Sequence, residues 1–171
     1  MAMTHDSNRI DTIISLMFEA ARSYLGGAKI IIDSDGINDD QGVLVPTLPV
    51  TTCLTLAIEI QLKALLIAHS VERPKGDGHD LLSLFNALPH SVQSKFIKFQ
   101  ISFTELNDDA FRKLLADEKD TFKTWRYPYE KPVLETQPAP LYHVALALSE
   151  YLKSHFEIER SDNGWLRKGA T

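Results

Sequence analysis

The segment from Cys53 to Ala68 is apolar on nearly every face of an α-helix, and it constrains the fold more than any other part of the chain. It reads CLTLAIEIQLKALLIA, and its polar exceptions are Thr55, Glu59, Gln61 and Lys63. A helix that is apolar all round must be covered on most sides, so we expect it to be the central helix of a bundle. A membrane span would need roughly 20 apolar residues, whereas here an acid and a base interrupt the run, so we expect no membrane association.

Glu59 and Lys63 stand four residues apart with the acid first, the better order for an ion pair within one helix. An exposed pair of this kind stabilises a helix by only about 0.3 kcal/mol. Among so many Leu and Ile side chains, however, the two charges would be tolerated only if other groups also bound them. The sequence therefore predicts either a surface pair or a polar cluster with partners elsewhere in the chain.

Composition indicates one soluble globular domain, because 44% of the 171 residues are hydrophobic and 24% are charged. We expect this domain to cover residues 1–160, followed by a polar, mobile tail at 161–171 in which Trp165 is exposed unless a partner covers it. The net charge of −5 disfavours a surface devoted to nucleic acid. Cys53 is the sole cysteine, which excludes an intramolecular disulfide, and MAMTHDSNR is not a secretory signal, so we expect a cytoplasmic protein.

The first part of the chain predicts a helix from Asp6 or Ser7 that Gly26 and Gly27 end. Residues 28–50 then break the helical pattern with two β-prone runs, KIIID and GVLVP, so we expect a small hairpin or an irregular insertion there. The acidic turn between these runs does not match a calcium loop, because Asn38 and Leu44 occupy the places of the required Gly and Glu.

Further helices follow from the spacing of apolar residues and from capping signals. The central helix should run from after Pro49 to about Val71, and His79 or Asp80 should cap the short helix LLSLFNAL. The segment SVQSKFIKFQISF suits a helix or a strand, and the next helix should start at Asp108 or Asp109 and end near Arg126. With a last helix from Leu141 to about Arg160, the sequence predicts an all-α bundle of five or six antiparallel helices.

Three short patches combine polar groups with strong apolar anchors: Glu59 with Lys63, His79 with Asp80, and the run WRYPYE from Trp125 to Glu130. Arg126, near a helix C-terminus, could bind Glu59 or Glu130 for purely structural reasons. Tyr127 could stack on a base or simply pack at the rim of the core. The histidines show no zinc spacing, and GxSxG, HExxH, GxGxxG and CxxC are absent, so we expect no metal and no cofactor.

The order of these patches resembles the HEPN family, the higher-eukaryote and prokaryote nucleotide-binding domains. The resemblance covers residues 5–158 by pattern and rests on AIEIQLKALL, GHDLLSLFNAL and WRYPYE. It implies a helical bundle that forms a homodimer, and many members of the family are metal-independent ribonucleases.

The catalytic members carry an Arg that is followed, after roughly four to six residues, by a His that acts on the ribose hydroxyl and the phosphate. Arg126 matches the Arg, but Lys131, Pro132 and Val133 stand where the His is due, and the next histidine is His143. Lysine does not normally replace imidazole, whose free pKa of about 6.5 suits proton transfer near neutrality. His79, oriented by Asp80, is a candidate substitute.

The expectation is therefore a non-catalytic HEPN-like module that binds a nucleotide, RNA or a partner protein, in a defence or toxin–antitoxin setting. The residues expected to form its polar cleft are Glu59, Lys63, His79, Asp80, Arg126, Tyr127 and Glu130. One alternative is a ribonuclease toxin that uses Arg126 and His79. The other is a structural domain that only dimerises, in which these polar residues hold the helices together.

Overall fold

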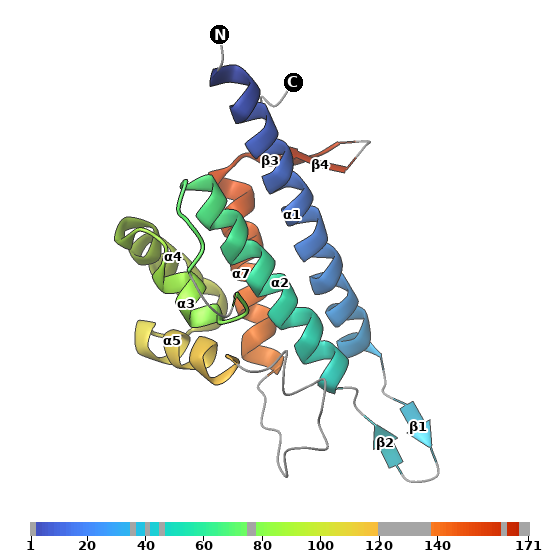
Figure 1. The fold of residues 1–171 in the computed structure, drawn as a ribbon. Coiled ribbons are helices and arrows are strands. Elements are labelled where there is room, and N and C mark those ends of the chain that lie inside the picture. The colour runs from blue at the N-terminus through green and yellow to red at the C-terminus, as the bar shows by residue number, and fades with distance from the viewer. Residues whose placement is uncertain are drawn as a thin grey trace.

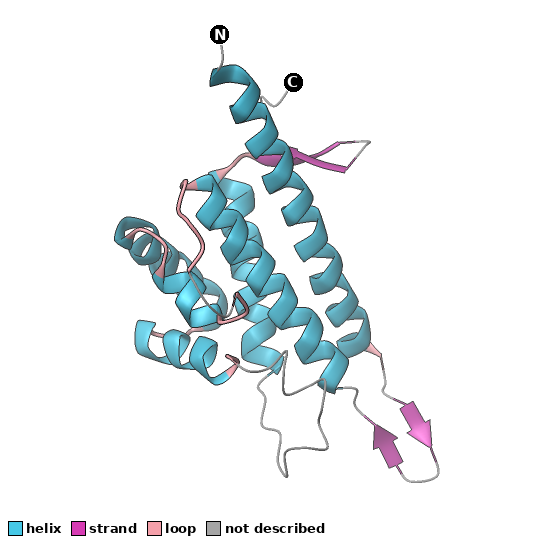
Figure 2. Ribbon diagram, in the orientation of Figure 1, coloured by secondary structure: helices cyan, strands magenta, loops and turns pink. Residues whose placement is uncertain are grey.

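The computed structural model describes residues 3–34, 37–39, 42–44, 47–74, 78–119, 138–161 and 164–167. Over these ranges the chain is mostly helical, with six helices and two small antiparallel hairpins, so the predicted all-α class is confirmed (Figures 1 and 2). The helices are α1 (Met3–Asp33), α2 (Thr47–Ala68), α3 (Leu81–Asn86), α4 (His90–Thr104), α5 (Asp108–Asp117) and α7 (Pro138–His155). The hairpins are β1 (Ile37–Asp39) with β2 (Gly42–Leu44), and β3 (Ile158–Ser161) with β4 (Gly164–Arg167).

Helix α2 is the central helix, as its apolar sequence predicted. It packs against α1 on one side and against α7 and α3 on others, while α4 lies along α7 and α5 contacts α3 (Figure 1). Leu54, Ile58, Leu62 and Leu65 are at most 1% exposed. By length and composition alone α2 could also cross a membrane, but most of its apolar window is buried inside the bundle, as in the core helix of a soluble protein.

The first helix is longer than the sequence predicted, and the expected end at Gly26 and Gly27 is wrong. Helix α1 continues to Asp33, so KIIID is helical and the insertion shrinks to the hairpin that pairs Ile37 with Leu44. Each glycine should cost a helix interior about 1 kcal/mol relative to alanine. Burial against α2 offsets that cost, because the buried stripe of α1 continues past the glycines; it consists of Ile14, Phe18, Ala21, Leu25 and Ala28.

In the middle of the chain, the structure decides whether one segment is a helix or a strand and corrects the predicted end of one helix. SVQSKFIKFQISF is helical, since it lies within α4 with Phe96 fully buried. Helix α5 begins at Asp108 as predicted, but the predicted end near Arg126 is wrong because the helix ends at Asp117. The sequence has no apolar residue between Ala116 and Phe122, so burial does not support a longer helix at this point.

The C-terminal part was predicted to leave Trp165 exposed, and that prediction is wrong. Strand β4 contacts α1, and the Trp165 ring lies edge-on to Phe18 with ring centroids 5.3 Å apart. The guanidinium of Arg22 lies 5.2 Å from the centre of the same ring, and Lys153 Nζ lies 5.9 Å from it. Trp165 is therefore half-buried, and the last helix ends at His155, earlier than expected, to leave room for β3.

Candidate functional site

A buried carboxylate of α2 binds basic side chains from two different parts of the chain. Glu59 is only 7% exposed. Its Oε1 accepts a hydrogen bond from Lys63 Nζ at 2.5 Å, and its Oε2 lies 2.9 Å from His79 Nδ1. The structure thus brings together two of the three patches that the sequence singled out, and we call Glu59, Lys63 and His79 the Glu59 cluster.

The turn that follows α2 brings His79 to this position. Ser70 adopts a left-handed backbone conformation with φ of 52°, and the N–H of Val71 donates to the carbonyl of Leu66 at 2.8 Å. These features end the helix and reverse the chain. Gly78, next to His79, lies beside α2, where a Cβ built on it would be 3.8 Å from Lys63 Nζ.

The three side chains of the Glu59 cluster differ in their access to solvent. The side chains of Glu59 and Lys63 are 9% and 15% exposed, whereas that of His79 is 41% exposed. A carboxylate that accepts from Nδ1–H fixes the neutral imidazole in the tautomer whose Nε2 is an acceptor. Chemically, the cluster is a buried ion pair with a partly exposed, oriented imidazole at its edge.

Asp80 fills only one of the two roles that the sequence suggested. Its Oδ1 accepts from the backbone N–H of Ser83 at 3.0 Å, which makes it the N-cap of α3. Its Oδ2 lies 3.7 Å from Nζ of Lys119, just past the end of α5. The capping prediction is confirmed, but the carboxylate that bonds the ring of His79 is Glu59.

The third patch lies outside the described residues. Arg126, Tyr127 and Glu130 all fall within 120–137, so their place in the cleft stays a prediction. Among the residues that the structure describes, no three His, Cys, Asp or Glu side chains gather in a way that could hold a metal ion. Burial raises the pKa of the half-buried Cys53 thiol, which makes it a poor nucleophile.

A second polar cluster, which the sequence analysis missed, joins three short helices. Arg112 of α5 donates from Nε to Asp108 Oδ1 at 2.6 Å, from Nη1 to Asn86 Oδ1 at 2.6 Å, and from Nη2 to Gln93 Oε1 at 3.1 Å. Its guanidinium also lies 5.1 Å from the centre of the Phe85 ring. Only the spacing of Asp108 and Arg112 could have suggested this Arg112 cluster from the sequence.

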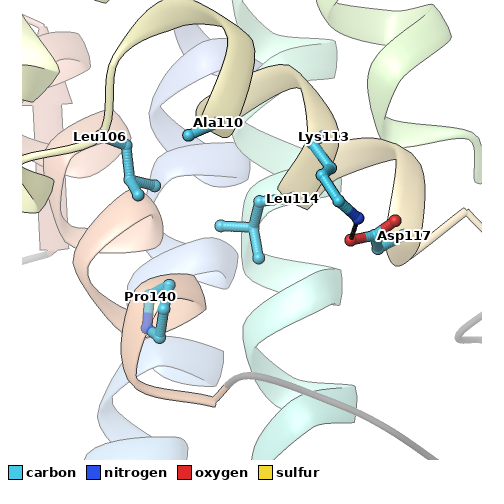
Figure 3. Close-up of a pocket in the computed structure, with 6 residues that line it drawn as sticks. All are labelled: Leu106, Ala110, Lys113, Leu114, Asp117 and Pro140. Carbon is cyan, nitrogen blue, oxygen red and sulfur yellow. Dashed lines mark hydrogen bonds and ion pairs between the residues drawn. The ribbon is translucent and has the colours of Figure 1, made fainter.

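Two hollows of the described surface are lined by residues of neither cluster. One, of about 170 Å³, lies between α5 and α7, with the ion pair of Lys113 and Asp117 at its edge (Figure 3). It is lined by Leu106, Ala110, Lys113, Leu114, Asp117 and Pro140. Another, of about 370 Å³, is lined by Glu150, Lys153, Ser154, Glu157, Ile158 and Glu159. Neither contains a residue that the sequence had marked as functional.

Comparison of the chain with protein-family models, with curated proteins and with solved structures finds no match in any of the three.

Proposed function

We propose that this protein is a non-catalytic HEPN-like module that binds a nucleotide, RNA or a partner protein through a polar cleft at the Glu59 cluster. The observation that carries the proposal is the contact between a buried Glu59 and a His79 side chain that is 41% exposed. The module would act as a cytoplasmic homodimer in a defence or toxin–antitoxin setting. Asp80 would shape the cleft by starting α3, and Arg126, Tyr127 and Glu130 would complete it.

A nucleotide is the ligand that the charges favour. Lys63 supplies hydrogen-bond donors and a positive charge, and the partly exposed ring of His79 lies beside it on the same carboxylate of Glu59. The whole chain carries a net charge of −5, which opposes the many phosphate contacts that a long RNA needs. A mononucleotide requires only a local cationic site.

A calorimetric titration with ATP, GTP, AMP and a short RNA tests this proposal. The wild type should bind at least one nucleotide, and His79→Ala should weaken binding at least tenfold because it removes the exposed imidazole. The matched control is His90→Ala, which removes an exposed histidine from the start of α4 and should leave binding unchanged. Wild-type protein that binds none of these compounds would leave the nucleotide and RNA versions without support.

The ribonuclease alternative rests on the tautomer of His79. A carboxylate at Nδ1 leaves Nε2 as the basic nitrogen of the ring, which is what a general base for the ribose hydroxyl requires. Arg126 would then stabilise the phosphate. Purified protein that cleaves mixed RNA, with loss of cleavage in both His79→Ala and Arg126→Ala, would establish this alternative, and intact RNA after long incubation would exclude it.

The structural alternative rests on the saturation of Glu59, whose two carboxylate oxygens are both already bound. In that case the cluster serves only to hold the residues just before α3 against α2. Arg126→Ala separates the cases: it should leave the melting temperature unchanged if Arg126 contacts a ligand, and lower it by several degrees if Arg126 is a structural partner.

A further inference from the structure

Helix α4 differs in charge from the rest of this acidic chain. No Asp or Glu occurs between Asp80 and Glu105, a stretch that includes all of α3 and α4, although the chain has 23 acidic residues. In the described part of the chain, every lysine except Lys95 and Lys98 of α4 forms an ion pair with a carboxylate. The paired lysines are Lys29, Lys63, Lys113, Lys119 and Lys153. Helix α4 therefore presents two cations that no described carboxylate pairs with.

Both lysines lie on the side of α4 that points away from the bundle. In Figure 1, α4 lies at the opposite edge of the bundle from α1. The exposed residues of α4 recur at three- and four-residue spacing, and we call the following set the α4 face: Ser91, Ser94, Lys95, Lys98, Ile101 and Ser102. Because the serines are short, the long side chains on this face are those of the two lysines and of Ile101, which is 47% exposed. The α4 face thus combines positive charge with an exposed apolar side chain.

Two histidines from other helices extend the positive charge beyond α4. His69, just after α2, and His155, at the end of α7, are both exposed. The His155 ring stacks on Tyr151 with centroids 3.8 Å apart, and the His69 ring lies edge-on to Phe156 at 6.1 Å. Burial lowers the pKa of His69, and the positive charges of His155 and Lys95 lower it further. Three elements thus bring groups of the same sign together, which is typical of a surface that binds an anionic partner.

The aromatic side chains beside the α4 face are packed against one another. Phe99 and Phe103 are half-buried and stack with centroids 5.2 Å apart, and Phe99 also lies edge-on to Tyr151 at 5.4 Å. Ring faces that already cover each other leave little surface on which nucleobases stack. The net charge of −5 further disfavours a long nucleic acid. A small anion would pair with the lysines but leave Ile101 exposed, whereas an acidic peptide with apolar side chains complements both features.

We propose that the α4 face, together with His69 and His155 beside it, docks an acidic segment of a partner protein that also carries apolar side chains. Lys95 and Lys98 are three residues apart, about 4.5 Å along the helix axis, so two carboxylates one turn apart on a helical partner would pair with them. An apolar side chain of the partner would cover Ile101. This surface shares no residue with the Glu59 cluster, so the inference does not depend on the function proposed for that cluster.

A titration of the ¹⁵N-labelled full chain, followed by NMR, tests the α4 face. The probe is a synthetic helical peptide in which Glu and Leu alternate at three- and four-residue spacing. It should shift the amide signals of Lys95, Lys98, Ile101, His69 and His155. A peptide of the same charge with Gln in place of Leu should bind at least about fivefold more weakly, because it leaves Ile101 uncovered. Wild-type protein that shows no shift with the Glu–Leu peptide overturns the proposal.

Charge reversal on α4 tests whether the two unpaired lysines carry the binding. Lys95→Glu with Lys98→Glu should weaken binding of the Glu–Leu peptide at least about tenfold. The matched control is Lys29→Glu with Lys113→Glu, which changes the net charge by the same amount at two exposed lysines of α1 and α5 and should leave binding unchanged. Circular dichroism confirms that each variant is folded. Equal losses in the two double variants would mean that only net charge matters and would overturn the proposal.

The pH dependence of binding tests the part of the two histidines. Between pH 7.5 and pH 5.5 both rings gain protons while the Glu side chains of the peptide, with a pKa of about 4.3, stay mostly ionised, so binding should become tighter. His69→Asn with His155→Asn should remove this dependence. A dependence that persists in that variant would exclude the histidines from the surface.

Oligouridine and inorganic phosphate serve as competing ligands. Neither should displace the Glu–Leu peptide when present at the same concentration. Tighter binding of oligouridine to Lys95 and Lys98 would assign the surface to nucleic acid, and tighter binding of phosphate would assign it to a small anion. Either result would overturn the proposal without changing what the nucleotide titration of His79→Ala reports about the Glu59 cluster.

Discussion

The Glu59 cluster and the Arg112 cluster both hold a charged side chain with several hydrogen bonds, yet they differ in where the partners come from. The side chain of Arg112 donates to residues of helices α3, α4 and α5, and its guanidinium also covers Phe85. Gln93 extends the same network by donating to the carbonyl of Leu88 at 2.7 Å. This arrangement is accounted for by the need to hold three short helices together.

In the Glu59 cluster the charged group is more deeply buried, and one partner, His79, comes from just before α3. The Glu59 side chain is 9% exposed against 31% for Arg112, yet its partner His79 is 41% exposed. A buried charge is costly, and here one of its compensating groups is presented to solvent instead of being enclosed. The comparison indicates that the Glu59 cluster is the better candidate for a ligand site and that the Arg112 cluster is structural.

The largest effect is expected from Glu59→Ala. Removal of the carboxylate leaves Lys63, 15% exposed, without its partner, and we expect the free energy of unfolding to fall by about 3 kcal/mol. Urea denaturation measures this change. Glu150→Ala is the control, because the Glu150 side chain is 34% exposed and its ion pairs are long, so it should change stability by less than about 0.5 kcal/mol. A loss below about 1 kcal/mol for Glu59→Ala would show that water solvates Lys63 once the carboxylate is gone. The difference in burial between the two clusters would then not correspond to a difference in stability.

Arg112→Ala should have the next largest effect. It removes three hydrogen bonds and the contact with Phe85, but the arginine is partly exposed, so we expect a loss of about 2 kcal/mol. Lys113→Ala on the same helix is the control, since its side chain is 73% exposed, and it should cost less than about 0.5 kcal/mol. If Arg112→Ala instead leaves stability unchanged but abolishes nucleotide binding, the roles assigned to the two clusters are reversed.

How much of this could be predicted from the sequence depends on how local each signal is. The central position of α2, the cap at Asp80 and the facing of Glu59 and Lys63 all follow from patterns within one helix or turn. The end of α1 was mispredicted because contacts with α2, distant in sequence, override the preference of Gly26 and Gly27 to end a helix.

Contacts between residues distant in sequence also account for what the sequence analysis missed. The bonds from Arg112 to Asn86 and Gln93, like the contact of Trp165 with Phe18, join residues far apart in the chain. No spacing rule for helices or strands links such positions. From the sequence, Glu59 could be predicted to need a partner, because it is a charge on an apolar helix. The sequence does not say that this partner is His79.

His79→Ala should have only a small effect on stability, much smaller than that of Glu59→Ala in the same cluster. Lys63 still neutralises Glu59 when the imidazole is gone, and the lost side chain is partly exposed, so we expect a cost below about 1 kcal/mol. Thermal melting measures it against Glu59→Ala. A destabilisation as large as that of Glu59→Ala would make the imidazole a structural partner and favour the purely structural alternative.

The smallest effect concerns His69, a histidine near the end of α2 that contacts a ring instead of a carboxylate. Burial lowers its pKa, and the positive charges of His155 and Lys95 lower it further, while its ring lies edge-on to Phe156 at 6.1 Å between centroids. Because its folded pKa is below the unfolded value of about 6.5, the unfolded chain binds more protons, so the free energy of unfolding should decrease as the pH falls below about 6.5. His69→Asn should make this decrease shallower, as measured by urea denaturation at pH 7.5, 6.5 and 5.5. The same slope in the variant and the wild type would mean that other groups set the acid sensitivity. A comparison of His69 with His79 would then say nothing about the effect of the Glu59 carboxylate on a histidine.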